Sequence, residues 1–218
     1  MRNSKANPET NSVLGLAHFK GTAIKDMLEA LVLFFVLFFP RPGGDFSFTG
    51  ELILSFCWRI PAVLLVVILL KKNLPPGKKD LSVGCICLPA LCITGFLISL
   101  GASRYFPPPK LPVPSGPLAW TAVVFSSLTT GYLEEGYFRL YLPERLRRAA
   151  LGPVKSLVIP ILIFALCHAY EGPWGFTNAL LAGTILSLGY RKMPGFHGIA
   201  LAHGIYNILA YLSGALLP

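Results

Sequence analysis

The stretch SVGCICLPALCITGFLISLG, Ser82–Gly101, decides the fold, because it carries no charge over a length that can cross a lipid bilayer. A spanning α-helix needs about 20 mainly apolar residues. The whole chain agrees: 54% of its residues are hydrophobic and 13% are charged, whereas a soluble domain carries about 25% charged residues. We therefore expect an all-α, polytopic transmembrane helix bundle.

Further apolar stretches on both sides of Ser82–Gly101 predict about seven membrane-spanning helices in total. Proline- and glycine-rich sequences such as PRPGGD, NLPPGKKD and FPPPKLPVPSGP separate several of them. Residues 1–21 form a polar cytoplasmic arm, and residues 22–218 form one transmembrane helical domain. The predicted helices are Thr22–Phe39, Glu51–Leu70, Ser82–Gly101, Leu118–Leu142, Lys155–Tyr170, Trp174–Tyr190 and Gly195–Leu217.

The net charge of +9 follows from the positive-inside rule, under which basic residues collect in cytoplasmic loops. When sides are assigned alternately along the seven predicted helices, fourteen basic residues fall on one side and three on the other. This places the N-terminus in the cytoplasm and the C-terminus outside, in an inner or plasma membrane. Because topology accounts for the charge, we expect the protein to contact a lipid bilayer and no nucleic acid.

The stretch GYLEEGYFRLYL, Gly131–Leu142, places three ionisable side chains in an apolar run. Ionisable residues inside membrane helices are costly, so they mark functional sites by default. Residues four apart share a helix face, which pairs Glu135 with Arg139. Glu134 points about 100° away from that pair and has Phe138 four residues on. A carboxylate with apolar neighbours is suited to accept a proton, so Glu134 is the candidate general base.

Two later predicted helices carry histidines at a similar depth. His168 lies in FALCHAY, and Phe164 precedes it by one turn, so the two rings should pack together. In LAHGIYN, His203 and Asn207 share one face. Counted from the cytoplasmic charges, Glu134 and His203 lie roughly 16 Å deep and His168 roughly 20 Å. We expect these groups to meet at one site, reached from the cytoplasm through a water-filled cleft.

The motifs EEGYFR, FALCH and HGIYN fit the patterns EExxxR, FxxxH and HxxxN on successive hydrophobic helices. In this order they resemble the CPBP family, which comprises Ras-converting CAAX endopeptidases, bacteriocin-processing and immunity proteins, and related bacterial intramembrane proteases. The resemblance covers about Leu118–Leu217. It implies that residues 22–218 are a transmembrane protease domain with its motif-bearing core at 118–217.

The resemblance also implies an activity, that of an intramembrane endopeptidase acting on a membrane-anchored protein or peptide. Glu134 would activate a water molecule with help from His168, while His203 and Asn207 would stabilise the oxyanion. We favour this mechanism without a metal. The alternative is Zn²⁺ held by Glu134, His168 and His203, a known kind of catalytic ligand set, although the HExxH spacing is absent. The supporting residues would be Glu135, Arg139 and Phe164.

Other interpretations stay open at this point. The ionisable residues of Leu118–Leu142 can form a purely structural ion network, and a chain of this fold can be a non-catalytic immunity or scaffold protein. Membrane carboxylates also serve as relays in small proton-coupled transporters, although we find no repeat in the sequence. Arg59, inside the second predicted helix, fits a structural role in which it pairs with Glu51 or Glu29.

Overall fold

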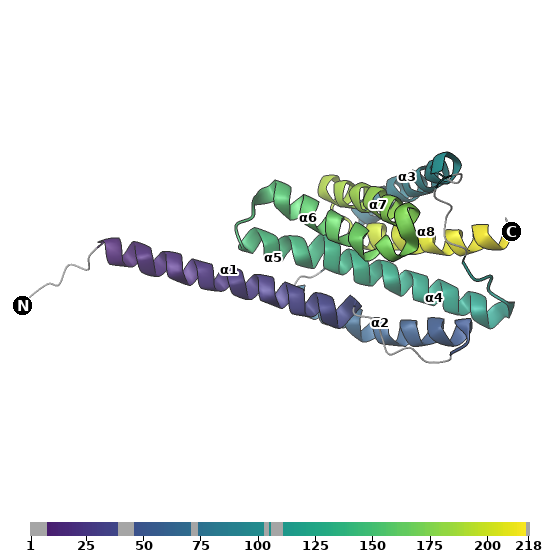
Figure 1. Ribbon diagram of the computed structural model, residues 1–218, viewed down its shortest axis with the longest axis horizontal. Helices are drawn as coiled ribbons and strands as arrows, with labels where there is room; N and C mark the ends of the chain where they lie inside the picture. The colour runs from purple at the N-terminus through teal and green to yellow at the C-terminus, as the bar shows by residue number, and fades with distance from the viewer. Residues whose placement is uncertain (1–7, 39–45, 71–73, 103–104, 106–110, 217–218) are drawn as a thin grey trace, which may run out of the picture.

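The computed structural model describes residues 8–38, 46–70, 74–102, 105 and 111–216, and every regular element in these ranges is a helix (Figure 1). The expected all-α fold is confirmed for this part of the chain. The elements are α1 (Pro8–Phe38), α2 (Phe48–Leu70), α3 (Lys78–Ala102), α4 (Gly116–Glu135), the π-helix η1 (Gly136–Tyr141), α5 (Leu142–Arg148), α6 (Gly152–Cys167), the 3₁₀-helix η2 (Ala169–Glu171), α7 (Gly172–Lys192) and α8 (Phe196–Leu216).

Each of the seven predicted helices has a counterpart in the structure, but three differ in form. The predicted helix Lys155–Tyr170 corresponds to α6, which ends at Cys167 and is followed by the short η2. The first helix begins at Pro8 rather than Thr22, so much of the predicted polar arm is helical. The predicted helix Leu118–Leu142 is not a single α-helix, because η1 interrupts it between α4 and α5. Phe39 and Leu217, the outer ends of two predicted helices, lie outside the described residues.

The described residues contain two helices, α2 and α3, that are long and apolar enough to cross a membrane alone. The stretches Gly152–Cys167 and Ala169–Lys192 pass the same test only together, as one broken span or a re-entrant loop. These apolar helices support an integral membrane protein. Seven spans and the orientation of the termini stay predictions.

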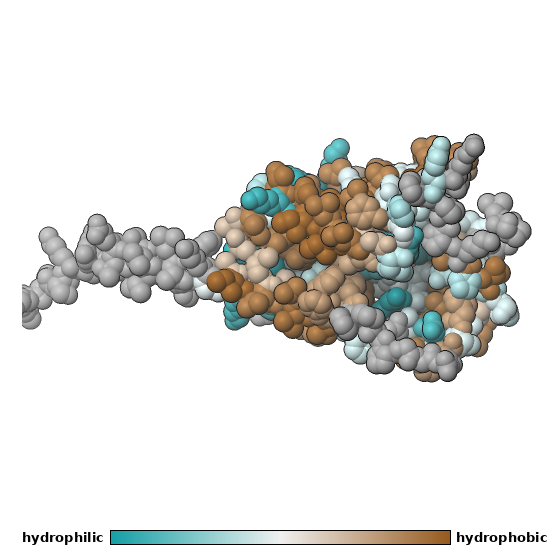
Figure 2. All heavy atoms as spheres, viewed as in Figure 1, coloured by the Kyte–Doolittle hydropathy of each residue, from teal (hydrophilic) through white to brown (hydrophobic). Residues whose placement is uncertain are grey.

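Apolar side chains cover the outside of the bundle as well as its core. Ile68 on α2 and Phe96 on α3, for example, are 68% and 63% exposed. Figure 2 shows apolar residues, in brown, across the middle of one face. Soluble monomers rarely present contiguous apolar surface on this scale, whereas lipid is a favourable solvent for it.

The helix α4 is central to the bundle. It packs against α8 and against α2, while α3 packs against both α8 and α7. The helix α6 packs against α7 and α5, and α1 lies against α5 with its N-terminal part extending away from the other helices (Figure 1). This arrangement places α4, α6 and α8, which carry the three sequence motifs, within one bundle.

Two glycines let α4 and α8 approach each other closely. A Cβ added to Gly131 on α4 would lie 2.4 Å from the carbonyl oxygen of Ala200 and 2.9 Å from the amide nitrogen of Gly204. A Cβ added to Gly204 on α8 would lie 2.9 Å from the Cα of Leu128. Small residues at such crossings allow backbones to touch inside membranes. The side chains that follow Gly131 on α4 are thereby brought to α8.

The start of α8 is tied to the loop before α3 and to α4. Asp80 accepts a hydrogen bond from the Gly198 amide at 3.0 Å. The ring of His197 connects two further groups: its Nε2 lies 2.6 Å from the Leu74 carbonyl oxygen, and its Nδ1 lies 3.2 Å from the Tyr132 hydroxyl. Because a carbonyl only accepts, Nε2 donates and Nδ1 accepts from Tyr132. These hydrogen bonds hold the first turn of α8 at a defined position along α4.

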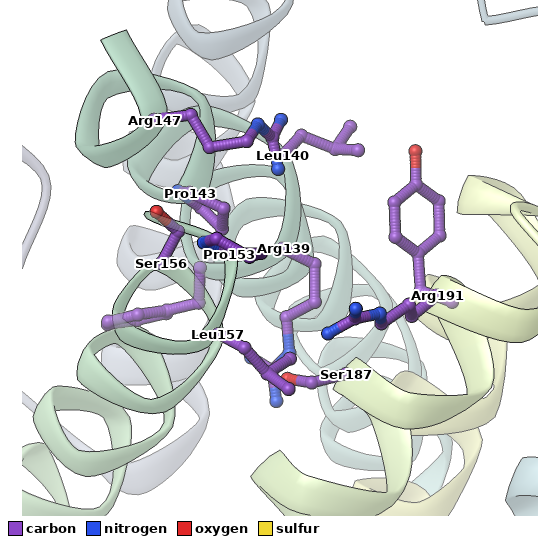
Figure 3. Close-up of a pocket in the computed structure, with 11 residues that line it drawn as sticks. Arg139, Leu140, Pro143, Arg147, Pro153, Ser156, Leu157, Ser187 and Arg191 are labelled. Carbon is purple, nitrogen blue, oxygen red and sulfur yellow. The ribbon is translucent and has the colours of Figure 1, made fainter. Parts of the chain in front are cut away.

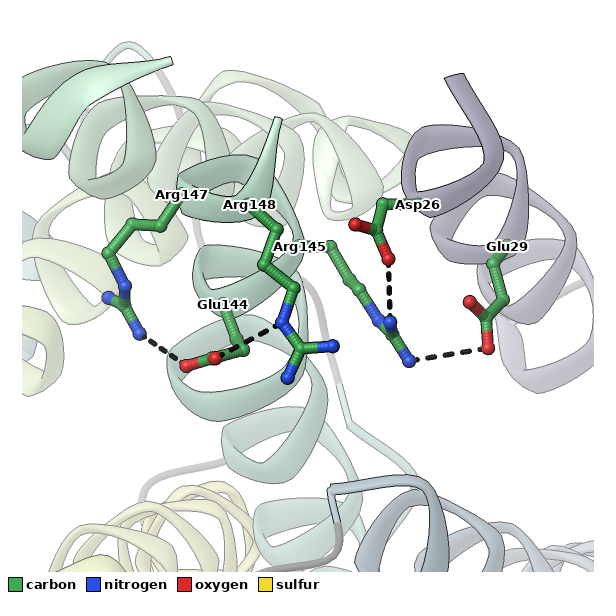
Figure 4. Close-up of polar contacts among 6 residues, drawn as sticks. All are labelled: Asp26, Glu29, Glu144, Arg145, Arg147 and Arg148. Carbon is green, nitrogen blue, oxygen red and sulfur yellow. Dashed lines mark hydrogen bonds and ion pairs between the residues drawn. The ribbon is translucent and has the colours of Figure 1, made fainter. Parts of the chain in front are cut away.

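A cluster of charged residues attaches α1 to α5. The guanidinium group of Arg145 lies 2.7 Å from a carboxylate oxygen of Asp26 and 3.2 Å from one of Glu29, as Figure 4 shows. Arg145 also lies over the ring of Tyr141, with its Cζ 4.8 Å from the ring centroid. The sequence analysis had no partner for Asp26, and the structure provides one on a helix distant in the sequence.

We predict that Gly131→Ala destabilises the protein by about 1–3 kcal/mol, because the added methyl group overlaps backbone atoms that cannot move independently. The measurement is thermal unfolding in detergent. Gly101→Ala on α3 is the matched control, since a Cβ there meets no other packed atom of the described residues within 4 Å. Equal melting temperatures for the two variants would contradict the close crossing.

We predict that Arg145→Gln loosens α1 at a cost of about 1–3 kcal/mol, the range for hydrogen bonds to charged groups. Limited proteolysis should then cut α1 faster than in the wild type. Arg148→Gln is the control, because Arg148 is 52% exposed and its ion-pair partner in the described part of the chain is Glu144 on its own helix, an arrangement of small energetic value. If both variants are cut equally, Arg145 does not anchor α1.

Candidate active site

The π-helix η1 follows the two carboxylates of α4 directly. All six of its residues, Gly136–Tyr141, are buried. A π-helix adds a residue to the turn and is often found at functional sites. Here it joins α4 to α5 and carries Arg139 within the core, close to Glu135 at the end of α4.

Glu135 is the fully enclosed carboxylate of the pair, with 0% of its side chain exposed. Its Oε1 lies 2.8 Å from Nδ1 of His203 on α8, and its Oε2 lies 3.0 Å from Nε of Arg139. The ion pair with Arg139 is the one that the four-residue spacing predicts. The bond to His203 is a contact that the sequence analysis missed, because spacing along one helix says nothing about a partner on another.

Glu134 has a different environment from its neighbour. Its side chain is 15% exposed, and its Oε2 lies 3.6 Å from Nε2 of His203, too far for a direct hydrogen bond. This oxygen is buried and has no hydrogen-bond partner among the described residues. Glu134 therefore presents a carboxylate oxygen to the His203 ring without being held by it.

The His203 ring lies between the two carboxylates. Glu135 as an ionised carboxylate can only accept, so Nδ1 of His203 carries the proton in that bond. This fixes which ring nitrogen is turned toward Glu134, namely Nε2. The arrangement resembles the orienting of a catalytic histidine by a buried carboxylate, which also stabilises positive charge on the ring.

His168 follows the last residue of α6, where the helix gives way to η2. Its Nδ1 lies 2.9 Å from the Phe164 carbonyl oxygen. Because the carbonyl only accepts, Nδ1 donates, and Nε2 of the neutral ring is left as the basic nitrogen. His168 is half-buried and, in the described part of the chain, forms no hydrogen bond with Glu134 or His203.

The aromatic ring of Phe164 connects the groups on three elements. Its centroid lies 4.8 Å from that of His168 and 5.9 Å from that of His203. The Cζ of Arg139 lies 4.5 Å from the same ring centroid. The ring thus packs against His168, as the spacing predicts, and it also contacts Phe138 in the apolar core.

Asn207 lies one helical turn after His203 on α8 and is half-buried. Its side chain has no hydrogen-bond partner in the part of the chain that the structure describes. The neighbouring Tyr206 donates a hydrogen bond of 2.9 Å to the Asn178 side chain and thereby ties α8 to α7. That contact gives no signal in the sequence, because neither residue belongs to a charged or periodic pattern.

The structure brings four of the predicted residues into direct polar contact or within 4 Å: Glu134, Glu135, Arg139 and His203. His168 is linked to them through the ring of Phe164 rather than by a hydrogen bond. The described residues contain no group of three or more His, Cys, Asp or Glu side chains placed to hold a metal ion. The predicted zinc set of Glu134, His168 and His203 is therefore not assembled as a ligand group in this conformation.

The family model described as Type II CAAX prenyl endopeptidase Rce1-like matches residues 116–209. The chain carries an Rce1-like domain. This domain begins with α4 and ends within α8, so it contains every candidate site residue, and it confirms the resemblance to the CPBP family. No curated protein and no solved structure matches the chain.

The Rce1-like domain also supports the broader expectation from the sequence, a CAAX-protease-like intramembrane endopeptidase. The helices before it, α1 to α3, lie outside the matched residues. They nevertheless contribute to the bundle that holds the domain, since α2 packs on α4 and α3 packs on α8.

We predict that the two adjacent carboxylates differ in their effect on stability. Glu135→Gln should lower the free energy of unfolding by about 3–5 kcal/mol, because it leaves a buried arginine without its counter-charge. Glu134→Gln should change it by less than about 1 kcal/mol, since Glu134 forms no hydrogen bond among the described residues and its Oε2 lies 3.6 Å from Nε2 of His203, too far for one. Denaturant unfolding in detergent measures both values. Equal losses would show that the two carboxylates have equivalent structural roles.

Proposed function

We propose that this protein is an intramembrane endopeptidase in which Glu134 activates a water molecule to attack a peptide carbonyl. The observation that carries the proposal is the Glu134 Oε2 atom, buried, without a hydrogen-bond partner in the described residues, and 3.6 Å from Nε2 of His203. A general base must be within reach of a proton that it can accept. The location of this carboxylate in an Rce1-like domain supports the assignment.

Glu134 is the better candidate base because the two carboxylates differ in their polar contacts. Both oxygens of Glu135 already have cationic or donor partners, Arg139 and His203. A carboxylate whose two oxygens are both engaged has no free oxygen to receive a proton from water. Among the described residues Glu134 forms no hydrogen bond, and its side chain is 15% exposed. We propose that the attacking water reaches it from this exposed side.

The proposed reaction balances with the residues present. Glu134 takes a proton from water while the water oxygen forms a bond to the carbonyl carbon, and the carbonyl π-electrons move to its oxygen. The tetrahedral oxyanion then collapses, the C–N bond breaks, and the leaving nitrogen receives a proton from Glu134. The products are a carboxyl group and an amine, and Glu134 returns to its initial state.

His203 and Asn207 are the proposed donors to the oxyanion. Glu135 accepts from Nδ1 of His203, and Nε2 faces Glu134. Nε2 donates to the oxyanion only when it too carries a proton, so the proposed donor is the imidazolium form of the ring. The Asn207 amide lies one turn further along the same helix. Pre-oriented donors in a site without bulk water stabilise developing negative charge strongly, and loss of one costs about 100- to 1000-fold in rate.

His168 is the proposed assistant of Glu134. Its Nδ1 proton is held by the Phe164 carbonyl oxygen, which leaves Nε2 free to accept a hydrogen bond from the attacking water. The fixed ring of Phe164 limits how far the imidazole can rotate. His168 would therefore orient the water while Glu134 takes the proton.

The proposed substrate is a membrane-associated protein or peptide. The family description names prenylated CAAX sequences, so a farnesylated CAAX peptide is the first probe. A leader-bearing peptide and a peptide with a C-terminal membrane-sorting tail are the other two probes. Cleavage is followed by mass spectrometry, which identifies the bond that is broken.

We predict that Glu134→Gln lowers kcat by about 100- to 10,000-fold, the contribution expected from a general base. Its melting temperature should stay at the wild-type value, which separates lost chemistry from lost folding. Glu51→Gln on α2 is the control, because this exposed glutamate lies outside the Rce1-like domain. Wild-type cleavage rates in Glu134→Gln would refute the glutamate mechanism.

Two further results would redirect the proposal. If a chelator abolishes cleavage and Zn²⁺ restores it, the metal-free mechanism is wrong. If Glu134→Ala supports the protein's role in the cell at normal expression, the protein acts as a non-catalytic member of its fold. Solute flux in proteoliposomes that is lost in Glu134→Gln, without any proteolysis, would instead indicate a transporter.

A further inference from the structure

A pocket of about 290 Å³ lies beside the candidate active site but is not lined by Glu134 or His203. It is formed where the end of η1, α5, the first turns of α6 and the last turns of α7 come together (Figure 3). Its polar lining residues are Arg139, Arg147, Arg191, Ser156, Ser187 and Tyr190. The mechanism proposed above makes no use of this pocket.

The lining of the pocket is cationic. Three arginines contribute to it and no acidic residue does. In Figure 3, Arg191 extends from α7 toward Arg139, and Arg147 lies above them on α5. Like charges gathered in one concave site repel one another unless an anion lies between them. The composition of the lining therefore indicates a negatively charged ligand.

Arg139 gives an independent indication of such a ligand. Its side chain is 2% exposed, and Glu135 neutralises it only through Nε. The two terminal nitrogens, Nη1 and Nη2, are buried and have no hydrogen-bond partner in the described residues. Buried guanidinium donors are normally satisfied, because leaving them unpaired is costly. A ligand that accepts hydrogen bonds in this pocket would satisfy both.

The two outer arginines are available for binding. Arg191 is exposed and has no ion-pair partner in the described part of the chain. Arg147 is 54% exposed and shares Glu144 with Arg148, so one carboxylate is divided between two cations. Both side chains already line the pocket and are exposed, so a ligand that enters the pocket can contact them.

We propose that this pocket binds a phosphate group at the membrane surface. Arginine recognises phosphate through paired N–H···O bonds, and the buried Ser187 and the Tyr190 hydroxyl add further donors. Apolar side chains, among them Phe138, Leu140 and Leu157, line the same pocket and suit the glycerol and first methylenes of a phospholipid. Basic pockets between membrane helices are known to bind lipid head groups.

The predicted topology agrees with this ligand. The loop charges place Arg147, Lys155 and Arg191 on the cytoplasmic side, where anionic head groups are concentrated. The proposal does not depend on proteolysis, because it concerns a pocket that the candidate catalytic residues do not line. Arg139 belongs to both sites, so the test leaves it unchanged.

The test uses the full-length protein in detergent and follows its melting temperature by tryptophan fluorescence at constant ionic strength. The probes are dihexanoylphosphatidic acid, dihexanoylphosphatidylcholine and inorganic phosphate, with chloride as the reference anion. A ligand of the folded state raises the melting temperature in a saturable way. We expect such a rise with phosphatidic acid. The rise should be much smaller with phosphatidylcholine, because its positively charged ammonium group is repelled by the arginines.

The double variant Arg147→Gln/Arg191→Gln should weaken binding by about tenfold or more, and Arg191→Gln alone by about threefold. The matched control is Arg148→Gln/Lys192→Gln, which removes the same charge one residue further along the same helices, outside the pocket lining. It should bind within about twofold of the wild type. All four substituted residues are exposed, so folding should be retained, and size-exclusion chromatography verifies it.

The outcomes distinguish the source of the phosphate and decide the proposal. Binding of phosphatidic acid alone identifies a lipid head group, and equal binding of inorganic phosphate identifies a free phosphate, in both cases with loss in the double variant. The proposal is overturned if no probe raises the melting temperature, or if the double variant binds as the wild type does. It is also overturned if the matched control weakens binding equally, because the anion is then attracted by the overall positive charge of the surface and not by the pocket.

Discussion

The rest of the site depends on the two polar contacts of the Glu135 carboxylate, one with His203 and one with Arg139. This carboxylate accepts from His203 on α8 at 2.8 Å and pairs with Arg139 in η1 at 3.0 Å, with no exposure to solvent. A charge buried so completely is tolerable only when its partners are correctly placed. The close crossing of α4 and α8, allowed by Gly131 and Gly204, is what places His203 there.

Two adjacent carboxylates therefore have different surroundings, because consecutive positions of a helix face different directions. A step of one residue rotates the side chain by about 100°, which turns Glu135 toward its partners and Glu134 toward the one free edge of the His203 ring. Pairs of titratable groups in contrasting environments are how a single site can hold one charge fixed and move a proton with the other. Under the proposed mechanism, a residue of the buried ion network and the general base occupy two consecutive positions.

Much of this could be predicted from the sequence, and the limits have physical causes. Helical periodicity gives contacts along one helix, so the pair Glu135–Arg139 and the packing of Phe164 on His168 follow from spacing. Contacts between helices depend on where the backbones cross, so the bond between Glu135 and His203 could not be derived. The interruption of Leu118–Leu142 by η1 was also missed, because the stretch has the apolar character of an uninterrupted span. The number of membrane spans shows a third limit. Among the described helices, α2 and α3 are each long and apolar enough to cross a membrane alone. The helices that carry the site contain polar residues, and these lower their mean hydropathy.

Because of the π-helix η1, the number of residues between α4 and α5 determines how α5 is oriented. Since η1 adds a residue to a helical turn, removing one residue between Gly136 and Tyr141 would restore a continuous α-helix and rotate everything after it by about 100°. Arg145 would then leave Asp26 and Glu29 on α1, and Arg147 would leave the arginine-lined pocket, although neither lies in the deleted turn. A single-residue gap in a homologous chain at this point would therefore mark a protein in which the contact of α1 with α5 and the lining of the arginine-rich pocket have changed together.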